Sequence, residues 1–313
     1  IPELLLSNAV FDKEDTGDDA LEKLFNSGLI GRKCILERDG MKIGFFSLLG
    51  KVADENAAFA KPVTFASQKT VAKEMVRELK KEKCDIIICL SHSGVATDKN
   101  GNITGEDVKL AKKVKGINVI ISGHTHTLLE NPVIVNGTAI VQAGEYGQYV
   151  GKLSLTYKNG KTTIDSYSLI PVDDRIAGNT VINELIENQE KLIDQEILLP
   201  LGMNYEKGIV ENDFLLECDW EGAFTESNLG PLVADAIHSY INRHTTKGTD
   251  MSLVATGVIR DKLVPGLQSA PDIFRIMSMG RGEDAVPGYP LAKVFVTGKE
   301  LKRVLEIMQI AYK

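Results

Sequence analysis

The sequence predicts an α/β fold, and three observations lead to this prediction. The chain has 313 residues, which is the size of about two domains with cores of their own. Two runs, "DIIICLS" at 85–91 and "INVIIS" at 117–122, are continuously apolar, as strands of a parallel or mixed sheet are when both faces are buried. Segments with helical spacing precede both runs, and this alternation is typical of a sheet covered by helices.

The helix before each strand is recognised from its apolar spacing. Four residues of 67–84 fall on one helical face: Val71, Met75, Val76 and Leu79. The second helix is expected over 106–116, where Thr104 and Asp107 have the spacing of a capping box and Gly116 marks the end.

The rest of the chain continues the α/β pattern. Antiparallel strands are expected over 138–172, with Asn159–Gly160 as a hairpin turn. The second unit is expected to hold a helix at 228–244, a strand at 251–257, and a strand followed by a helix from 293 on. We therefore expect a first domain at 1–174, a connector helix at 175–200 and a smaller second domain at 201–313.

Composition and charge exclude several classes of protein. The net charge is −7 and the isoelectric point is about 5.4, which argues against a nucleic-acid binder but leaves small phosphorylated substrates open. No apolar run has the length of a membrane span. The four cysteines form no CxxC pair, so the sequence gives no support for a structural zinc site.

Three of the five histidines follow the two buried strands. His92 comes after the first strand, and His124 and His126 come after the second. Ligands of open α/β sheets collect at the carboxyl ends of strands, so these imidazoles are expected at one edge. Imidazole suits zinc, manganese or iron, and two such ions close together can activate water for phosphoester cleavage. The i, i+2 spacing lets two imidazoles address two adjacent ions, or two sides of one.

The residues alone leave a second interpretation open. A histidine after a strand is often a loop residue whose ring bonds to backbone carbonyls. Gly123 is expected to let the backbone turn sharply and approach closely. His238 and His244 lie on and after an amphipathic helix, and we interpret both as structural.

The two strands and the histidine loops that follow them resemble motifs of a known family. "DIIICLSHSG" followed by "NVIISGHTHT" resembles the second half of a calcineurin-like metallophosphoesterase domain, and more specifically the 5′-nucleotidase family, which includes UDP-sugar hydrolases and 2′,3′-cyclic-nucleotide phosphodiesterases. The segments "ESNLGPLVADAI", "ATGVIRDKL" and "VFVTGKELKRVLE" resemble that family's C-terminal domain, in the family's order. The resemblance implies a metallophosphoesterase α/β sandwich followed by a smaller substrate-binding domain.

The resemblance also implies an activity and a set of site residues. The activity would be hydrolysis of a nucleotide phosphoester by a hydroxide that bridges two divalent ions, such as zinc, manganese or iron. His92 and His124 would bind one ion, and His126 would bind the other. The partner would be a small nucleotide or related phosphoester, not a nucleic acid. A periplasmic, secreted or cell-surface location is suggested by the resemblance alone, and the oligomeric state is left open.

The chain departs from the family on the metal side. The family's Asp-x-His, bridging Asp and Asn-His ligands would all lie upstream of Ile1, and the last helix has no stop signal, so we expect a chain truncated at both ends. Three histidines then cannot complete a two-metal centre. We therefore expect this stretch alone to be inactive and to bind either no ion or one ion weakly. We assign no catalytic residue within it.

The chain also departs on the substrate side. Arg260 would meet the phosphate or ribose region, since arginine suits bidentate phosphate recognition, although an ordinary surface ion pair is the alternative. Gly257 lies in Thr-Gly-Val where the family has Asn-Gly-Gly or Ser-Gly-Gly. Met279 replaces a base-stacking phenylalanine, and Arg281 is either a second phosphate contact or a solvated charge.

Two other functions therefore remain as alternatives. One is a non-catalytic nucleotide-binding module on the same scaffold. The other is a thiosulfate-ester hydrolase of a type that resembles this family, which the altered substrate loop keeps open.

Overall fold

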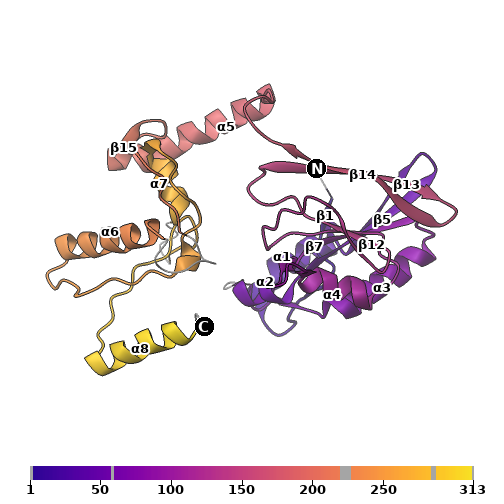
Figure 1. Cartoon of the computed structure of the whole chain (residues 1–313), viewed down its shortest axis with the longest axis horizontal. Helices are drawn as coiled ribbons and strands as arrows, with labels where there is room; N and C mark the ends of the chain where they lie inside the picture. The colour runs from indigo at the N-terminus through magenta and orange to yellow at the C-terminus, as the bar shows by residue number, and fades with distance from the viewer. Residues whose placement is uncertain (1–2, 58–59, 219–226, 283–286, 312–313) are drawn as a thin grey trace. The chain divides into compact units, whose positions relative to one another are not determined.

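The computed structural model describes residues 3–57, 60–218, 227–282 and 287–311 (Figure 1). The chain divides into two compact units, Ile1–Ala177 and Gly178–Lys313. Both contain helices and strands, so the predicted α/β class is confirmed. The boundary lies inside the stretch that the sequence predicted to be a connector, and each unit is described below by itself.

The first unit is built around a six-stranded mixed sheet with the strand order β11–β12–β10–β7–β5–β4. The four central strands are parallel to one another, whereas the two edge strands are antiparallel to their neighbours. This arrangement explains why the central strands are so strongly apolar. The strands are β4 (Lys33–Arg38), β5 (Met41–Leu49), β7 (Ile86–His92), β10 (Val119–Ile121), β11 (Val133–Val135) and β12 (Thr138–Val141).

Helices lie on one side of this sheet and a long hairpin lies on the other (Figure 1). The hairpin joins β13 (Tyr149–Lys158) to β14 (Lys161–Pro171). Its turn residues Asn159 and Gly160 have φ of 52° and 74°, so the predicted Asn-Gly turn is confirmed. The helices are α1 (Asp19–Asn26), α2 (Lys51–Asn56), α3 (Gln68–Lys81) and α4 (Glu106–Lys113).

The core of the first unit lies between the sheet and helices α3 and α4. Phe46, Ile120 and Ile140 are fully buried on the sheet and belong to one cluster with Met75 and Leu79 of α3. Burying a side chain of this size stabilises the fold by about 1.5–3 kcal/mol. This cluster therefore anchors the strands whose ends carry the histidines.

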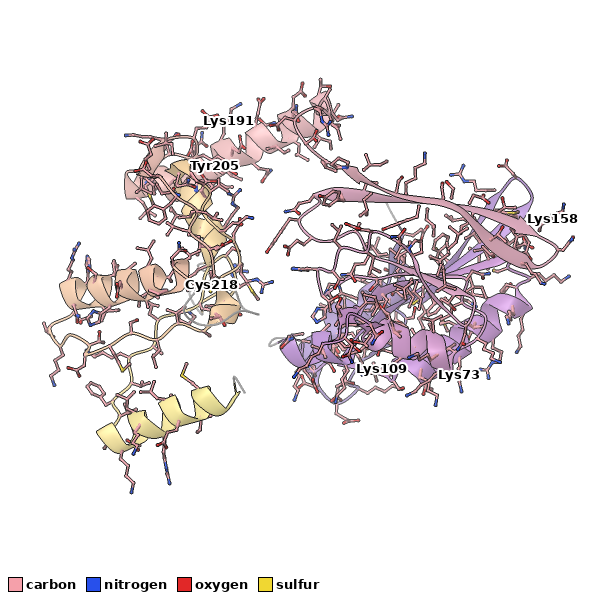
Figure 2. All side chains as sticks on the ribbon, viewed as in Figure 1. Lys73, Lys109, Lys158, Lys191, Tyr205 and Cys218 are labelled. Atoms are coloured by element: carbon pink, nitrogen blue, oxygen red, sulfur yellow. The ribbon has the colours of Figure 1, made fainter. Side chains whose placement is uncertain are left out.

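The outer faces of the two covering helices are basic. The side chains of Lys73 on α3 and Lys109 on α4 point away from the sheet (Figure 2). The remaining elements of the unit are short: β1 (Leu4–Leu5) with β3 (Ile30–Gly31), β2 (Ala9–Val10) with β6 (Thr64–Phe65), β8 (Ala96–Thr97) with β9 (Ile103–Thr104), and η1 (Thr16–Asp18).

The second unit has a smaller core and only one pair of strands among its described residues. The strands β15 (Gly208–Asn212) and β16 (Gly266–Ser269) pair antiparallel. The core of the unit consists of the buried residues Leu216, Leu229, Ile259, Leu263 and Ile276. Within the described part of the chain, no helix of either unit is long and apolar enough to span a bilayer. The elements are α5 (Thr180–Ile193), η2 (Asp194–Leu198), η3 (Leu199–Leu201), β15 (Gly208–Asn212), α6 (Leu229–His244), η5 (Thr256–Val258), β16 (Gly266–Ser269), α7 (Ala270–Ile276) and α8 (Gly298–Ala311).

Three local predictions are wrong. Residues 251–257 form only the short η5 at their end, and the run from 293 is not a strand. An apolar run becomes a strand only when another strand pairs with it, and here Val294 and Phe295 are 74% and 82% exposed. The expected capping box of α4 is also absent, because its N-cap is Gly105, which has φ of 106° and makes no side-chain bond.

Candidate functional site

The two histidine loops leave the sheet at the same edge. β7 ends at His92, and β10 ends at Ile121, three residues before His124. The two strands are parallel neighbours in which Leu90 is opposite Ile121. Strand pairing therefore places both loops side by side at the carboxyl ends, where ligands of such sheets bind.

The structure brings the rings of His92 and His124 together. Their centroids are 5.0 Å apart and their planes are tilted by 58°. A Cβ added to Gly123 would lie 3.4 Å from His92 Nδ1, so the backbone passes close to this ring, as expected for glycine. The sharp turn is not at Gly123, however. The positive φ values of this loop belong to His124 and His126, at 76° and 58°.

The residue between these two histidines locks the loop in place. Thr125 Oγ1 accepts a hydrogen bond from Val95 N at 3.1 Å, and Thr127 Oγ1 donates to Val95 O at 2.8 Å. A Cβ on Gly94 would lie 2.2 Å from Thr125 Cγ2. Glycine at 94 is thus needed for the two loops to touch. These contacts offset the strain of a left-handed backbone at two non-glycine residues.

His126 has different partners from the other two histidines. Its Nδ1 contacts the Glu145 carboxylate, and its ring centroid lies 5.8 Å from that of Tyr146. Glu145 and Tyr146 follow β12, the next strand in the sheet. Sequence reasoning missed both residues, although "QAGEYG" directly after an apolar strand is the same kind of signal as "SGHTH".

A buried carboxylate joins the two loops from behind. Asp107 is fully buried and accepts hydrogen bonds from Ser91 Oγ and Ser122 Oγ, both at 2.6 Å, and from Gly94 N at 3.1 Å. Ser91 immediately precedes His92, and Ser122 lies two residues before His124. The sequence predicted that Asp107 caps its own helix. Instead, its carboxylate fixes the ends of β7 and β10.

Burial shifts the titration of this group and of its neighbours. Burial raises the pKa of Asp107, against the hydrogen bonds from Ser122 and Ser91. Burial lowers the pKa of His92, helped by the nearby rings of His124 and His126. Burial also lowers the pKa of His124, although Glu106 opposes this. Lower pKa values favour neutral imidazole, which is the form that binds metals.

The side chains fit a metal ion only in part. His92 and His124 offer two imidazoles at one point, and the Nδ1 of His126 contacts Glu145. Within the part of the chain that the structure describes, no group of three or more His, Cys, Asp or Glu side chains is arranged to hold an ion. A catalytic zinc site uses three protein ligands. The assignment of the three histidines as metal ligands stays a prediction.

The predicted substrate residues all belong to the second unit. Arg260 Nη1 donates to Gly257 O at 3.3 Å, and Arg260 N donates to Ile276 O at 2.7 Å, so this arginine is fixed on the small core. Met279 is 40% exposed. Arg281 forms an isolated antiparallel bridge with Pro287. Their roles toward a substrate stay predictions.

The other polar residues that the sequence singled out have local partners. His238 Nε2 lies 2.8 Å from Thr249 O, and the ring of His244 stacks on Tyr240 with centroids 4.2 Å apart. These contacts agree with structural roles for both histidines.

Two family models match the chain in the order that the motifs predicted. Residues 14–128 match the calcineurin-like phosphoesterase, and residues 216–313 match the 5′-nucleotidase C-terminal domain. The chain therefore combines a calcineurin-like phosphoesterase domain with a 5′-nucleotidase C-terminal domain. The resemblance read from the motifs is therefore confirmed.

Individual relatives agree with these two matches. A 5′-nucleotidase from Vibrio parahaemolyticus is 28% identical over 313 residues, covering 88% of this chain and 52% of the relative. A trifunctional nucleotide phosphoesterase from Bacillus subtilis is 27% identical, covering 87% of this chain and 17% of the relative. The chain thus spans about half, or less, of the length of these relatives.

Solved structures share the fold. A 5′-nucleotidase precursor from Thermus thermophilus superposes with a TM-score of 0.68 at 22% identity, covering 88% of this chain and 52% of that one. The sulfate thiohydrolase SoxB of the same organism superposes with a TM-score of 0.61 at 19% identity, covering 88% and 45%. At such identities the likeness establishes the fold alone.

Proposed function

We propose that the protein containing these residues is a metal-dependent phosphoester hydrolase that acts on a nucleotide. The observation that carries this proposal is the pair of His92 and His124, whose rings lie 5.0 Å apart at the carboxyl edge of the sheet. The family contains 5′-nucleotidases, and neutral imidazoles at this edge are suited to divalent ions.

The histidines would each do a distinct part of the work. His92 and His124 would hold one divalent ion through neutral nitrogens. His126 would donate a hydrogen bond from its Nδ1–H to the Glu145 carboxylate, which orients the ring and leaves Nε2 available as a ligand. Bound metal ions would supply an activated water and neutralise phosphate oxygens. Asp107 would keep both loops in register without touching the substrate.

The second unit would recognise the rest of the substrate. Arg260 is supported by its bond to the Gly257 carbonyl and would present its guanidinium to phosphate or ribose. Met279 is exposed and would pack loosely on a base, and Arg281 would add a second cation. A loose contact of this kind favours broad substrate choice.

We propose further that residues 1–313 alone turn over nucleotides at most very slowly. The imidazoles of His92 and His124 supply two nitrogens, which is one fewer than a catalytic zinc site takes from protein. Turnover by the purified stretch that persists after removal of contaminating phosphatases would contradict this part.

The test uses the full-length protein with added divalent metal. The substrates are AMP, a UDP-sugar, a 2′,3′-cyclic nucleotide and an S-sulfonate, and we expect a nucleotide to be preferred. His92→Ala and His124→Ala should each lower kcat/KM by more than about 100-fold, the upper loss seen when only a supporting partner of a metal ligand is removed. His244→Ala is the matched control and should leave kcat/KM unchanged. Equal activity in all three variants, or turnover of the S-sulfonate alone, would overturn the proposal.

A further inference from the structure

Gln142 is a buried glutamine at the end of the strand beside the two histidine strands. It directly follows β12 and is 3% exposed. Because β12 is a parallel neighbour of β10, Gln142 lies at the same carboxyl edge as the histidine loops. A buried amide carries both donors and an acceptor, which must be bonded inside the protein. The partners of this side chain therefore indicate its role.

The neighbours of Gln142 determine which way its amide points. Ser122 Oγ donates its one proton to Asp107 Oδ2 at 2.6 Å, so this hydroxyl can only accept a hydrogen bond from Gln142. Gln142 therefore presents its Nε2 to Ser122 Oγ, at 3.0 Å. Its Oε1 is then directed at the histidine loop. The amide thus joins the Asp107 network to the segment that carries His126.

Two successive backbone N–H groups of the histidine loop converge on the Gln142 oxygen. His126 N donates to it at 3.1 Å and Thr127 N at 2.9 Å, and Thr125 Oγ1 donates at 3.3 Å. Successive N–H groups can share one acceptor where the backbone passes through a left-handed residue, and His126 has φ of 58°. The amide oxygen therefore stabilises the strained backbone at His126 itself.

The chain that follows Gln142 holds the ring of the same histidine. Ala143 forms an isolated antiparallel bridge with Leu128, just beyond the histidine loop. Two residues after Ala143, the carboxylate of Glu145 contacts His126 Nδ1. The backbone of His126 is thus held by the side chain at 142, and its ring is held by the carboxylate at 145.

The pair of His92 and His124 has its own support. Their rings lie 5.0 Å apart, and both loops bond directly to Asp107. Among the hydrogen bonds of the residues that the structure describes, none joins Gln142 to either ring. Removing the amide should therefore displace His126 and leave the pair in place.

We propose that Gln142 is a positioning residue that sets His126 relative to the pair of His92 and His124. The inference rests on the proposed function, in which the pair holds one divalent ion and His126 serves a second. Gln142 touches neither ion nor substrate and acts only through the loop. Its loss should weaken the binding of the second ion and leave the first nearly unchanged.

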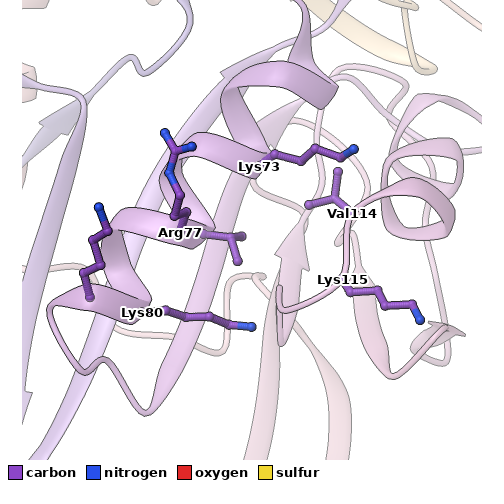
Figure 3. Close-up of a pocket in the computed structure, with 7 residues that line it drawn as sticks. Lys73, Arg77, Lys80, Val114 and Lys115 are labelled. Carbon is purple, nitrogen blue, oxygen red and sulfur yellow. The ribbon is translucent and has the colours of Figure 1, made fainter.

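The decisive variant is Gln142→Met, which keeps the length of the side chain but removes its acceptor and its donors. Gln142→Glu keeps an oxygen for the loop and should bind the second ion more tightly than Gln142→Met does. The matched control is Gln268→Met, because Gln268 is a glutamine of the second unit that is 4% exposed. Lys115→Met is an exposed control in the first unit, since Lys115 precedes β10 and points away from helix α3 (Figure 3).

The first measurement is made on the full-length protein in EDTA, so it does not depend on a bound metal. Hydrogen exchange at the amides of His126 and Thr127 should be roughly three- to tenfold faster in Gln142→Met, because both amides lose their acceptor. Both control variants should exchange like the parent at these amides. Exchange at the parent rate in Gln142→Met would overturn the proposal, since the amide oxygen would then not hold the loop.

The second measurement titrates the protein with Mn²⁺ alone and counts bound ions by electron paramagnetic resonance. The parent should bind two ions. In Gln142→Met the second ion should bind about 10- to 100-fold more weakly, which is the usual loss when a supporting partner of a metal ligand is removed, and the first should stay within about threefold. On the preferred nucleotide, kcat should fall at limiting Mn²⁺ and recover at saturating Mn²⁺.

Two outcomes of the titration would assign Gln142 a purely structural role and overturn the proposal. They are equal weakening of both ions and a fall in kcat that saturating Mn²⁺ does not reverse. A parent that binds only one ion would overturn it as well. A parent that binds two ions but hydrolyses no nucleotide would overturn the proposed function instead, because the titration would still decide whether Gln142 controls the second ion.

Discussion

At the scale of single residues, one buried side chain organises the site. Asp107 is fully buried and joins Ser91, Gly94 and Ser122, which belong to the two histidine loops. Burying a carboxylate destabilises the folded state unless its oxygens accept hydrogen bonds. Here three donors give hydrogen bonds to the Asp107 carboxylate. Asp107 thus fixes the backbone of the two loops that carry His92 and His124.

We predict that Asp107→Ala lowers the free energy of unfolding by about 1–3 kcal/mol, because it leaves two hydroxyl groups and one N–H buried without their acceptor. Urea denaturation of the chain measures this loss, with Asp174→Asn as an exposed carboxylate control that should change little. A variant as stable as the parent would mean that water or a side-chain shift replaces the carboxylate.

At the scale of elements, α3 is tied to the sheet edge by two ion pairs in addition to its apolar face. The Lys33–Glu78 pair joins it to β4 at 2.8 Å, and both side chains are about a third exposed. The hydrogen bond from Lys33 lowers the pKa of Glu78, ahead of the smaller charge effects of Lys33, Arg32 and Arg77. Partial exposure limits such a pair to a modest contribution.

The lowered pKa sets the sign of a pH effect. Stability from Glu78 is present above its unfolded pKa and is lost as the pH falls through the lower folded pKa. Glu78→Gln should therefore cost about 0.5 kcal/mol at pH 7 and nothing in strong acid. Unfolding curves at several pH values measure this, with Glu82→Gln as a control one turn away. A cost that persists in acid would mean that packing, not charge, is responsible.

At the scale of the whole molecule, local patterns predicted more of the structure than did distant contacts. The two buried strands, the Asn-Gly turn and helices α3, α4 and α6 follow from side-chain periodicity, and strand order alone placed His92 beside His124. The contact of His126 with Glu145 and the role of Asp107 depend on packing between separate loops, which periodicity does not record. The strands predicted at 251–257 and from 293 are not formed, because a strand also depends on a distant pairing partner that periodicity does not record.

The two units also differ in the size of their cores, and this predicts how the chain melts. The first unit buries a large cluster around Ile120, which is 0% exposed, whereas the second has a small one around Ile259, which is 2% exposed. We expect two thermal transitions in calorimetry, with the second unit melting first. Ile120→Ala and Ile259→Ala each remove a buried side chain at a cost of about 2–5 kcal/mol.

Each substitution should lower only the transition of its own unit, because the lost packing lies inside one core. Ile120→Ala should shift the upper transition, and Ile259→Ala should shift the lower. The paired variants serve as controls for each other, since they make the same chemical change. If either variant moved both transitions together, the two units would unfold as one cooperative body, and the division at residue 177 would have no thermodynamic meaning.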